Sequence, residues 1–222
     1  MEVIERLLHL DIEVVQIDLE IEGLDTLKHL YCSAQISVLE EEVPLELQGS
    51  DLEVISVGTY QYDDGLEKEV TLRSTENKTY YLLVDDNDGD PLLCFSIKIE
   101  RAMIESLFDL EQFSILFDDD YAQIKTQDIT VLPEGWTKEG VYIQTEKDVE
   151  GYFYQDDLIV KKITASSMQN DKCEEFRGFI CELNKDENYS LSIEVWSSGE
   201  TDVFLGVSVP TDVILEMWPN AK

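Results

Sequence analysis

Residues 82–108 read LLVDDNDGDPLLCFSIKIERAMIESLF, and this stretch decides the expected fold. Leu93, Phe95 and Ile97 alternate with other residues, which is the period-two pattern of a β-strand with one buried face. The acidic segment DDNDGDP before them is typical of a turn between two strands. After the strand, apolar residues recur at helical spacing, so a short helix is expected over residues 100–110.

A second stretch, IEVWSSGETDVFLGVSVPTDVILEMWP at residues 193–219, shows the same order of strand, acidic glycine turn, strand and helix. Ile97 then matches Val207. Further upstream, GTYQYDD at residues 58–64 resembles GYFYQDD at residues 151–157, at a different offset. Either the chain contains an internal duplication, or the rules for turns and alternating strands made two unrelated hairpins look alike.

The rest of the chain repeats these patterns, so the sequence predicts a mainly β protein of the α+β class. The expected strands are 12–21, 36–38, 43–47, 52–62, 70–72, 80–84, 93–99, 113–117, 158–163, 176–183, 191–195 and 203–209. Further short helices are expected over residues 1–10 and 24–33 and after Pro210. The expected architecture is two similar antiparallel β-units, each ending in a short helix, packed into one compact protein.

A loop rich in proline and glycine around Trp136 is the expected boundary between the two units. The first unit, residues 1–132, is β-rich and carries the N-terminal helix. The second unit, residues 133–222, is β-rich and is the part in which residues 50–110 would be duplicated. A groove between two such units is the usual place for a ligand or a peptide.

The net charge restricts the classes of partner. Asp and Glu number 49 and Lys and Arg 16, which gives a formal net charge of −33. Such a surface repels phosphate backbones and anionic membranes, so nucleic-acid binding is not expected. It favours contact with a basic protein partner. Hydrophobic residues make up 43% of the chain, so we expect a folded core rather than a disordered tail.

The cysteines and the N-terminal sequence bear on the compartment. None of the four cysteines forms a CxxC pair, and Cys94 and Cys181 lie in apolar alternating runs that are typical of buried thiols. The first residues lack the basic start and apolar stretch of a signal peptide. No apolar run approaches the roughly 18 residues that span a bilayer. We therefore expect a cytoplasmic protein with free thiols and no direct membrane insertion.

No residue pattern indicates catalysis, a cofactor or a metal. If Gly89 is the sixth position of a calcium loop, Val84 takes the first position, where an oxygen ligand is needed. The two histidines are His9 and His29, and the spacing of His29 and Cys32 in an apolar segment is more typical of packing than of a nucleophile. The motifs GxGxxG, GxxxxGK[ST] and HExxH are missing. The expected catalytic, cofactor-binding and metal-ligating residues are therefore none.

Acidic runs and aromatic residues are the expected contacts with the basic partner. The candidate partner-binding residues are Trp136, Trp218, Glu40, Glu41, Glu42, Asp118, Asp119 and Asp120. Trp136 lies in the proline- and glycine-rich loop and is the best candidate for an exposed aromatic residue. The acidic runs are typical of solvated turns, where a basic surface would land. Packing in the core is the alternative for the aromatic residues and fits Trp196 better.

The segment LGVSVPTDVILEMW, residues 205–218, resembles the ending of the YjfK-like family of uncharacterised bacterial proteins. The residues that match its Leu-Gly-Val-x-[IV]-Pro stretch are Leu205, Gly206, Val207, Val209 and Pro210. Residues 24–27 and 52–65 resemble the front half of that family. The resemblance implies a cytoplasmic accessory protein of bacterial envelope stress, encoded beside proteins of the PspA type. Basic coiled coils of that type would then be the partners.

Three functions are consistent with these observations. The first is a non-enzymatic binding or scaffold protein whose acidic surface engages a basic protein partner. The second is an enzyme or small-ligand-binding protein that uses carboxylates in a groove between the two β-units. It would show a deep pocket with converging acids and at least one raised pKa. The third is an immunity-type or nucleic-acid-mimicking inhibitor, with acids spaced like phosphates along one face.

Overall fold

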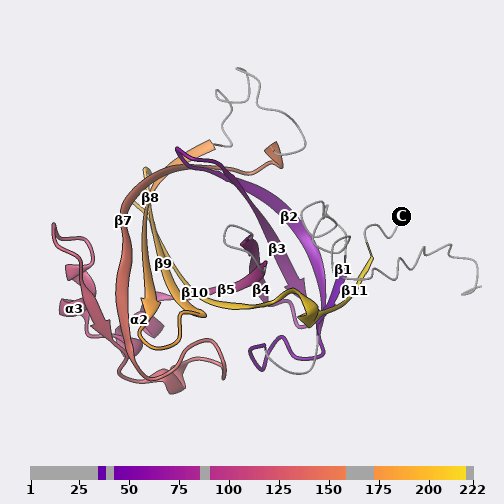
Figure 1. Ribbon diagram of the computed structural model, residues 1–222, viewed down its shortest axis with the longest axis horizontal. Helices are drawn as coiled ribbons and strands as arrows, with labels where there is room; N and C mark the ends of the chain where they lie inside the picture. The colour runs from indigo at the N-terminus through magenta and orange to yellow at the C-terminus, as the bar shows by residue number, and fades with distance from the viewer. Residues whose placement is uncertain (1–34, 39–42, 86–90, 159–172, 219–222) are drawn as a thin grey trace, which may run out of the picture.

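A computed structural model describes residues 35–38, 43–85, 91–158 and 173–218 (Figure 1). The strands are β1 (Gln35–Val38), β2 (Asp51–Gln61), β3 (Leu66–Ser74), β4 (Thr79–Asp85), β5 (Leu92–Lys98), β6 (Gln123–Lys125), β7 (Val141–Tyr154), β8 (Cys173–Leu183), β9 (Tyr189–Trp196), β10 (Thr201–Pro210) and β11 (Ile214–Trp218). The helices are α2 (Arg101–Leu107) and α3 (Leu110–Ile115), with 3-10 turns η1 (Ile129–Val131) and η3 (Thr211–Val213). The predicted mainly β class is confirmed. The elements predicted over residues 1–33 lie outside the described residues, as does nearly all of the strand predicted over 158–163.

The strands form one antiparallel sheet that closes on itself. Its order is β11-β1-β2-β3-β4-β5-β10-β9-β8-β7-β6, and β2 also pairs with β7. This extra pairing joins β2, β3, β4, β5, β10, β9, β8 and β7 into a ring, which Figure 1 shows as a curved wall around an open centre. Both closing strands are long. The start of β2 pairs with β1, and its end, at Thr59 to Gln61, pairs with β7.

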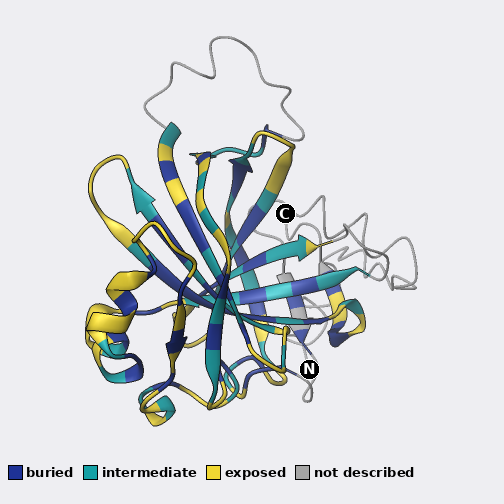
Figure 2. Cartoon of the chain, turned by 60° about the vertical axis from the view of Figure 1, so that its left-hand side comes forward, coloured by how far each residue is buried: buried dark blue, intermediate teal, exposed yellow. Residues whose placement is uncertain are grey.

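The ring strands turn their apolar faces outward. On β9, Leu191 and Ile193 belong to an apolar core, whereas Ser190, Ser192 and Glu194 alternate with them on the opposite face. A similar alternation of buried with less buried residues runs along β4 and β5, whereas the middle of β10 is buried on both faces (Figure 2). Because successive side chains of a strand point to opposite faces, the inside of the ring receives most of the small and polar residues, together with several aromatic rings.

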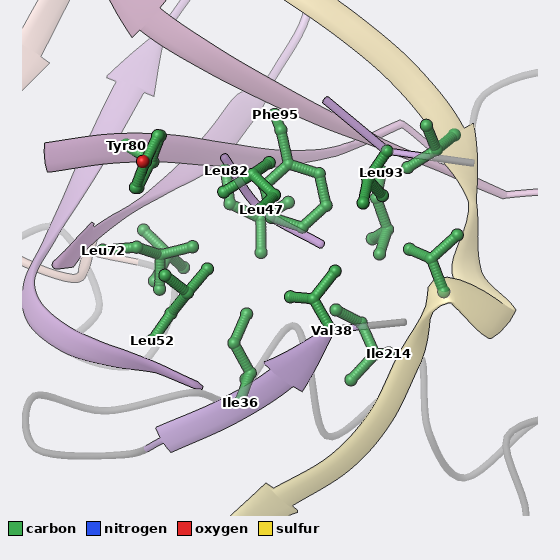
Figure 3. Close-up of a cluster of buried hydrophobic side chains, with 14 of the residues drawn as sticks. Ile36, Val38, Leu47, Leu52, Leu72, Tyr80, Leu82, Leu93, Phe95 and Ile214 are labelled. Atoms are coloured by element: carbon green, nitrogen blue, oxygen red, sulfur yellow. The ribbon is translucent and has the colours of Figure 1, made fainter. Parts of the chain in front are cut away.

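Two apolar cores cover the outside of the ring. One lies between β1, β11 and the outward faces of β2 to β5 and β10; Figure 3 shows Ile36 and Val38 of β1 beneath Leu82 of β4. The other lies between α2, α3, β6 and the outward faces of β8, β9 and β10. Burying these faces supplies most of the hydrophobic stabilisation, at about 25 cal/mol per Å² of apolar surface. The interior of the ring is therefore free to hold polar groups.

The helix predicted over residues 100–110 is confirmed as α2, which buries Ile104 and Leu107 against the second core. The strand predicted over 113–117 is wrong, because α3 occupies most of this segment. The Asp109 carboxylate caps that helix by accepting hydrogen bonds from two backbone N–H groups of its first turn. None of the described helices is long and apolar enough to cross a bilayer.

Two other predicted elements are also wrong. Residues 43–47 form a turn rather than a strand, with the backbone N–H of Leu47 donating to the carbonyl of Pro44 at 2.8 Å. The helix predicted after Pro210 is only the short turn η3, after which the chain becomes β11 and pairs with β1. Apolar residues at 213, 214 and 217 fit both a helix and this turn-strand segment, and pairing with β1 decides for the strand.

The ring contains two four-stranded halves, β2 to β5 and β7 to β10, which meet along two seams. At one seam Ser96 pairs with Gly206, and at the other Tyr60 pairs with Phe153. The alignment that matches Ile97 with Val207 also matches the first pair. The alignment of residues 58–64 with 151–157 matches the second. At each seam, the two paired residues are therefore equivalent positions of the two similar stretches of sequence.

Candidate functional site

The inside of the ring holds a cavity of about 760 Å³. This is within the range of roughly 300–1,000 Å³ that ligand sites occupy. All eight ring strands contribute lining residues, and small side chains keep the space open. The small residues on its wall are Cys94, Ser96, Gly178, Ser190, Ser192 and Gly206. A Cβ atom added to Gly206 would lie 2.4 Å from Ser190 Oγ, so the side chain of this neighbouring lining residue takes the space beside the glycine.

The cavity is lined by carboxylates of one sign. Among the residues that the structure describes, eight Asp and Glu residues line it, and no Lys, Arg or His does. Six of them are exposed, at the mouth, namely Asp63, Asp64, Glu67, Glu146, Asp148 and Glu150. The other two, Glu69 and Glu194, are only 6% and 9% exposed and form the floor. The field inside the cavity therefore favours a positive charge.

The floor is a hydrogen-bonded group of two carboxylates and one hydroxyl. Tyr60 Oη lies 2.8 Å from Glu194 Oε1 and 3.2 Å from Glu69 Oε2. The three side chains come from β2, β3 and β9, and the last two strands lie opposite each other in the ring. The group therefore crosses the interior and links facing walls of the sheet.

Burial makes ionisation of both carboxylates unfavourable. Burial and the neighbouring charge of Glu194 raise the pKa of Glu69 to about 8, and burial raises the pKa of Glu194 to about 7. Burial also raises the pKa of Tyr60 well above its usual range, so its hydroxyl keeps its proton. A hydroxyl donates one proton, which Tyr60 gives to Glu194 over the shorter distance. The second contact is satisfied when protonated Glu69 donates to the Tyr60 oxygen.

One oxygen of this floor has no partner. Among the described residues, Glu194 Oε2 is buried without a hydrogen bond. The charge of Lys98 acts on Glu194, but Lys98 is itself held in an ion pair with Asp202 at 2.6 Å. A buried acceptor without a donor costs about 1–3 kcal/mol. A donor that enters the cavity would remove this cost.

Aromatic rings surround the floor. Tyr62 stacks on Tyr60 with ring centroids 6.1 Å apart, and Phe176 meets Tyr60 edge-on at 5.5 Å. Trp196 lies 5.4 Å from Phe176 on the same side of the ring. Aromatic faces beside carboxylates are the surroundings in which proteins hold organic ammonium groups.

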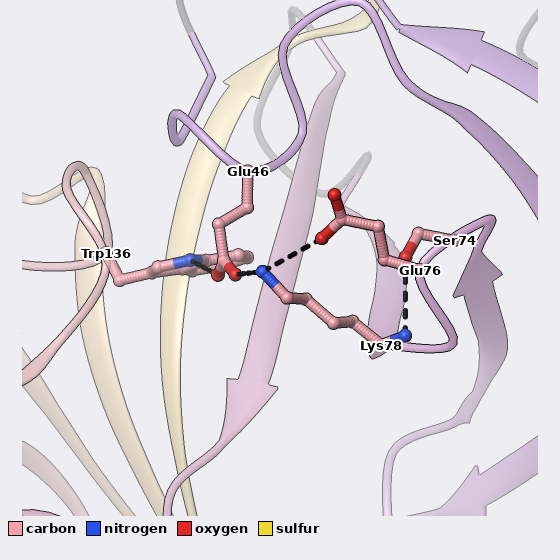
Figure 4. A network of polar contacts seen from close by, with 5 residues as sticks. All are labelled: Glu46, Ser74, Glu76, Lys78 and Trp136. Carbon is pink, nitrogen blue, oxygen red and sulfur yellow. Dashed lines mark hydrogen bonds and ion pairs between the residues drawn. The ribbon is translucent and has the colours of Figure 1, made fainter.

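The prediction that Trp136 is an exposed contact is wrong. Its side chain is 0% exposed and stacks on Tyr80 of β4 at 5.9 Å. Its Nε1–H donates to Glu46 Oε2 at 3.0 Å, and Lys78 forms an ion pair with the other oxygen of Glu46 (Figure 4). The proline and glycine residues correctly predict a loop, but that loop folds back onto the first core.

Of the remaining candidate residues, the structure describes the side chains of Asp118, Asp119 and Asp120, and these do not line the cavity. Asp118, Asp119 and Asp120 are exposed in the turn after α3, and Lys147 Nζ donates to the backbone carbonyl of Asp120 at 2.9 Å. Glu40, Glu41, Glu42 and the side chain of Trp218 lie outside what the structure describes. The role of these residues in binding a basic partner stays a prediction.

Sequence reasoning missed Tyr60, Glu69 and Glu194. The available signal was the segment YSLSIEVW of β9, in which serine and glutamate occupy one face and leucine, isoleucine and valine the other. That pattern is the same for a strand whose polar face meets solvent. In the described part of the chain, no three or more His, Cys, Asp or Glu residues are grouped to hold a metal ion.

The resemblance to the YjfK-like family stays a prediction. No protein-family model, curated protein or solved structure matches this chain.

Proposed function

We propose that the protein binds a small organic cation in the cavity inside its closed sheet. The observation that carries this proposal is the buried pair Glu69 and Glu194 at the floor of a cavity whose described lining residues include no basic one. Two carboxylates in a poorly solvated site repel each other, and each loses favourable hydration. A cation between them would compensate both costs.

The floor also offers the hydrogen-bond acceptors that an ammonium group needs. Glu194 Oε2 is free to accept, and ionised Glu69 would accept once its proton leaves. Hydrogen bonds in which both partners are charged are about twice as strong as neutral ones. The ring of Tyr62, which is less buried than Tyr60, adds an attraction of about 0.5–2 kcal/mol for a cation placed over its face.

We also infer that the two halves of the ring are copies of one ancestral β-unit. The support is the pairing of aligned positions at both seams, Ser96 with Gly206 and Tyr60 with Phe153. The cavity then lies between two similar units, with Glu69 supplied by the first and Glu194 by the second. This is the arrangement that the small-ligand alternative from the sequence requires.

Titration calorimetry at pH 8 tests the proposed function with three probes of similar size: n-butylamine, n-butanol and butyrate. We expect the amine to bind and the neutral and anionic probes to bind at least tenfold more weakly. The double variant Glu69→Gln/Glu194→Gln should lose most of the amine affinity, because its floor cannot ionise.

A matched control removes the same charge elsewhere. The variant Asp118→Asn/Asp119→Asn changes two exposed acids outside the cavity and should bind the amine as the wild type does. Equal loss of affinity in both double variants would mean that the overall charge of −33 attracts the amine and that the cavity does not bind it.

A further inference from the structure

The acids of the cavity form two tiers. The lower tier is the floor pair Glu69 and Glu194. The upper tier is Glu67 and Glu146, which line the same cavity closer to its mouth. Glu67 and Glu69 are two residues apart on β3 and point to the same side, so the tiers are separated by about 7 Å along the strand.

The upper tier lacks compensating charges. Elsewhere on the rim, Arg177 lies 3.1 Å from Asp148 and 3.8 Å from Glu150. Within the described residues, no basic side chain forms an ion pair with Glu67 or Glu146. Although part of Glu67 is exposed to solvent, the protein around its carboxylate reduces hydration, and this desolvation together with the charges of Asp85, Asp64 and Glu146 raises the pKa of Glu67.

Much of the remaining cavity wall is uncharged. Small residues of β5 and β9, together with Leu83 and Ile180, are the uncharged part of the cavity lining. Burial raises the pKa of the Cys94 thiol on this wall, which keeps it neutral. Such a surface accommodates a short methylene chain but offers no counter-charge to a group placed halfway along the cavity.

From this geometry we infer that the ligand is a linear α,ω-diamine, with one ammonium group between Glu69 and Glu194 and the other beside Glu67 and Glu146. Each bond of about 1.5 Å advances an extended zigzag chain by about 1.25 Å, so the five or six bonds through four or five methylene groups separate two nitrogens by about 6–7.5 Å, which matches the distance between the tiers. This inference rests on the proposed function and specifies its ligand class.

The test is a calorimetric series at pH 8 of α,ω-diaminoalkanes with three to eight carbons, each compared with the n-alkylamine of the same length. We expect the affinity to be highest at four or five carbons. There the diamine should bind about five- to tenfold more tightly than its monoamine, because the second ion pair is partly exposed. The variant Glu67→Gln/Glu146→Gln should abolish this advantage, whereas Asp118→Asn/Asp119→Asn should preserve it.

The outcomes separate the two proposals. If monoamines bind and diamines of every length bind no tighter, the diamine inference is overturned and the proposed function stands. If the advantage of the diamine persists in Glu67→Gln/Glu146→Gln, the second ammonium group does not bind the upper tier and the inference is again overturned. If neither class of amine binds, the proposed function itself fails.

Discussion

Tyr60 on β2 donates a hydrogen bond to Glu194 on β9 across the interior of the closed sheet, with 2.8 Å between the two oxygens. These strands are not neighbours in the ring, so the bond joins walls that the backbone ladder does not connect directly. Both side chains are buried, and a hydrogen bond to a charged group is stronger in such surroundings than in water. The floor of the cavity is therefore a structural link as well as a polar site.

Replacing Tyr60 by Phe should destabilise the protein by about 1–3 kcal/mol at pH 7, because it leaves the buried carboxylate of Glu194 without its donor. Urea unfolding followed by circular dichroism measures the change. Tyr121→Phe is the matched control. The Tyr121 side chain is 66% exposed, so removing its hydroxyl leaves no buried group without a hydrogen-bond partner. A variant Tyr60→Phe as stable as the wild type would show that the bond contributes nothing to the fold.

The stability of the protein should respond to the ionisation of Glu69. Its pKa is about 8 in the folded state, against an ordinary value of 4.5. Between these values the folded protein keeps a proton that the unfolded chain has released, so this group lowers the free energy of unfolding as the pH rises. The slope approaches about 1.4 kcal/mol per pH unit for one group. Well below pH 4.5, Glu69 is protonated in both the folded and the unfolded protein, so the effect vanishes.

The variant Glu69→Gln cannot ionise and should lack this loss. Its free energy of unfolding relative to that of the wild type should therefore increase steadily from pH 5 to pH 8, as measured by urea unfolding at each pH. Glu194 and Tyr60 face the same group and remain in both proteins, so the difference isolates Glu69. A difference that stays constant over this range would mean that Glu69 ionises in the folded protein as it does in water.

Local sequence patterns predicted where the strands lie better than they predicted which face of each strand is enclosed. The alternation over residues 93–99 and 203–209 correctly located β5 and β10, because a strand with one apolar face has a period of two wherever it lies. The same alternation cannot show which side is enclosed. Closure depends on the pairing of Tyr60 with Phe153, and no local signal specifies a contact between segments so far apart in the chain.

The candidate site was unpredictable for the same reason. Glu69 lies in the segment LEKEVTLRS, in which two glutamates and a lysine precede the apolar residues. In a chain with 49 acidic residues, one more glutamate on a polar face carries no information. Only the closed sheet distinguishes Glu69 and Glu194 from the acids that meet solvent.

Trp136 should behave as a core residue. Trp136→Ala removes the ring that stacks on Tyr80 and leaves Glu46 without one of its donors, so we expect a loss of about 3–5 kcal/mol in the free energy of unfolding. The conservative variant Trp136→Phe should lose less, because most of the packing remains. A change below about 0.5 kcal/mol for Trp136→Ala is what an exposed tryptophan would give, and it would contradict the burial of this side chain.

Filling the cavity should abolish ligand binding without unfolding the protein. Ser192 lines the cavity on β9, and its strand partners are Ile180 on β8 and Phe204 on β10. Ser192→Leu places an isobutyl group in the empty space above the floor, so it should cost little stability while excluding the amine. We expect the n-butylamine affinity to fall by at least tenfold in calorimetry, with the urea midpoint nearly unchanged.

Ser192→Ala, which keeps the space open, should bind the amine as the wild type does. Full affinity in a folded Ser192→Leu protein would place the amine outside the ring.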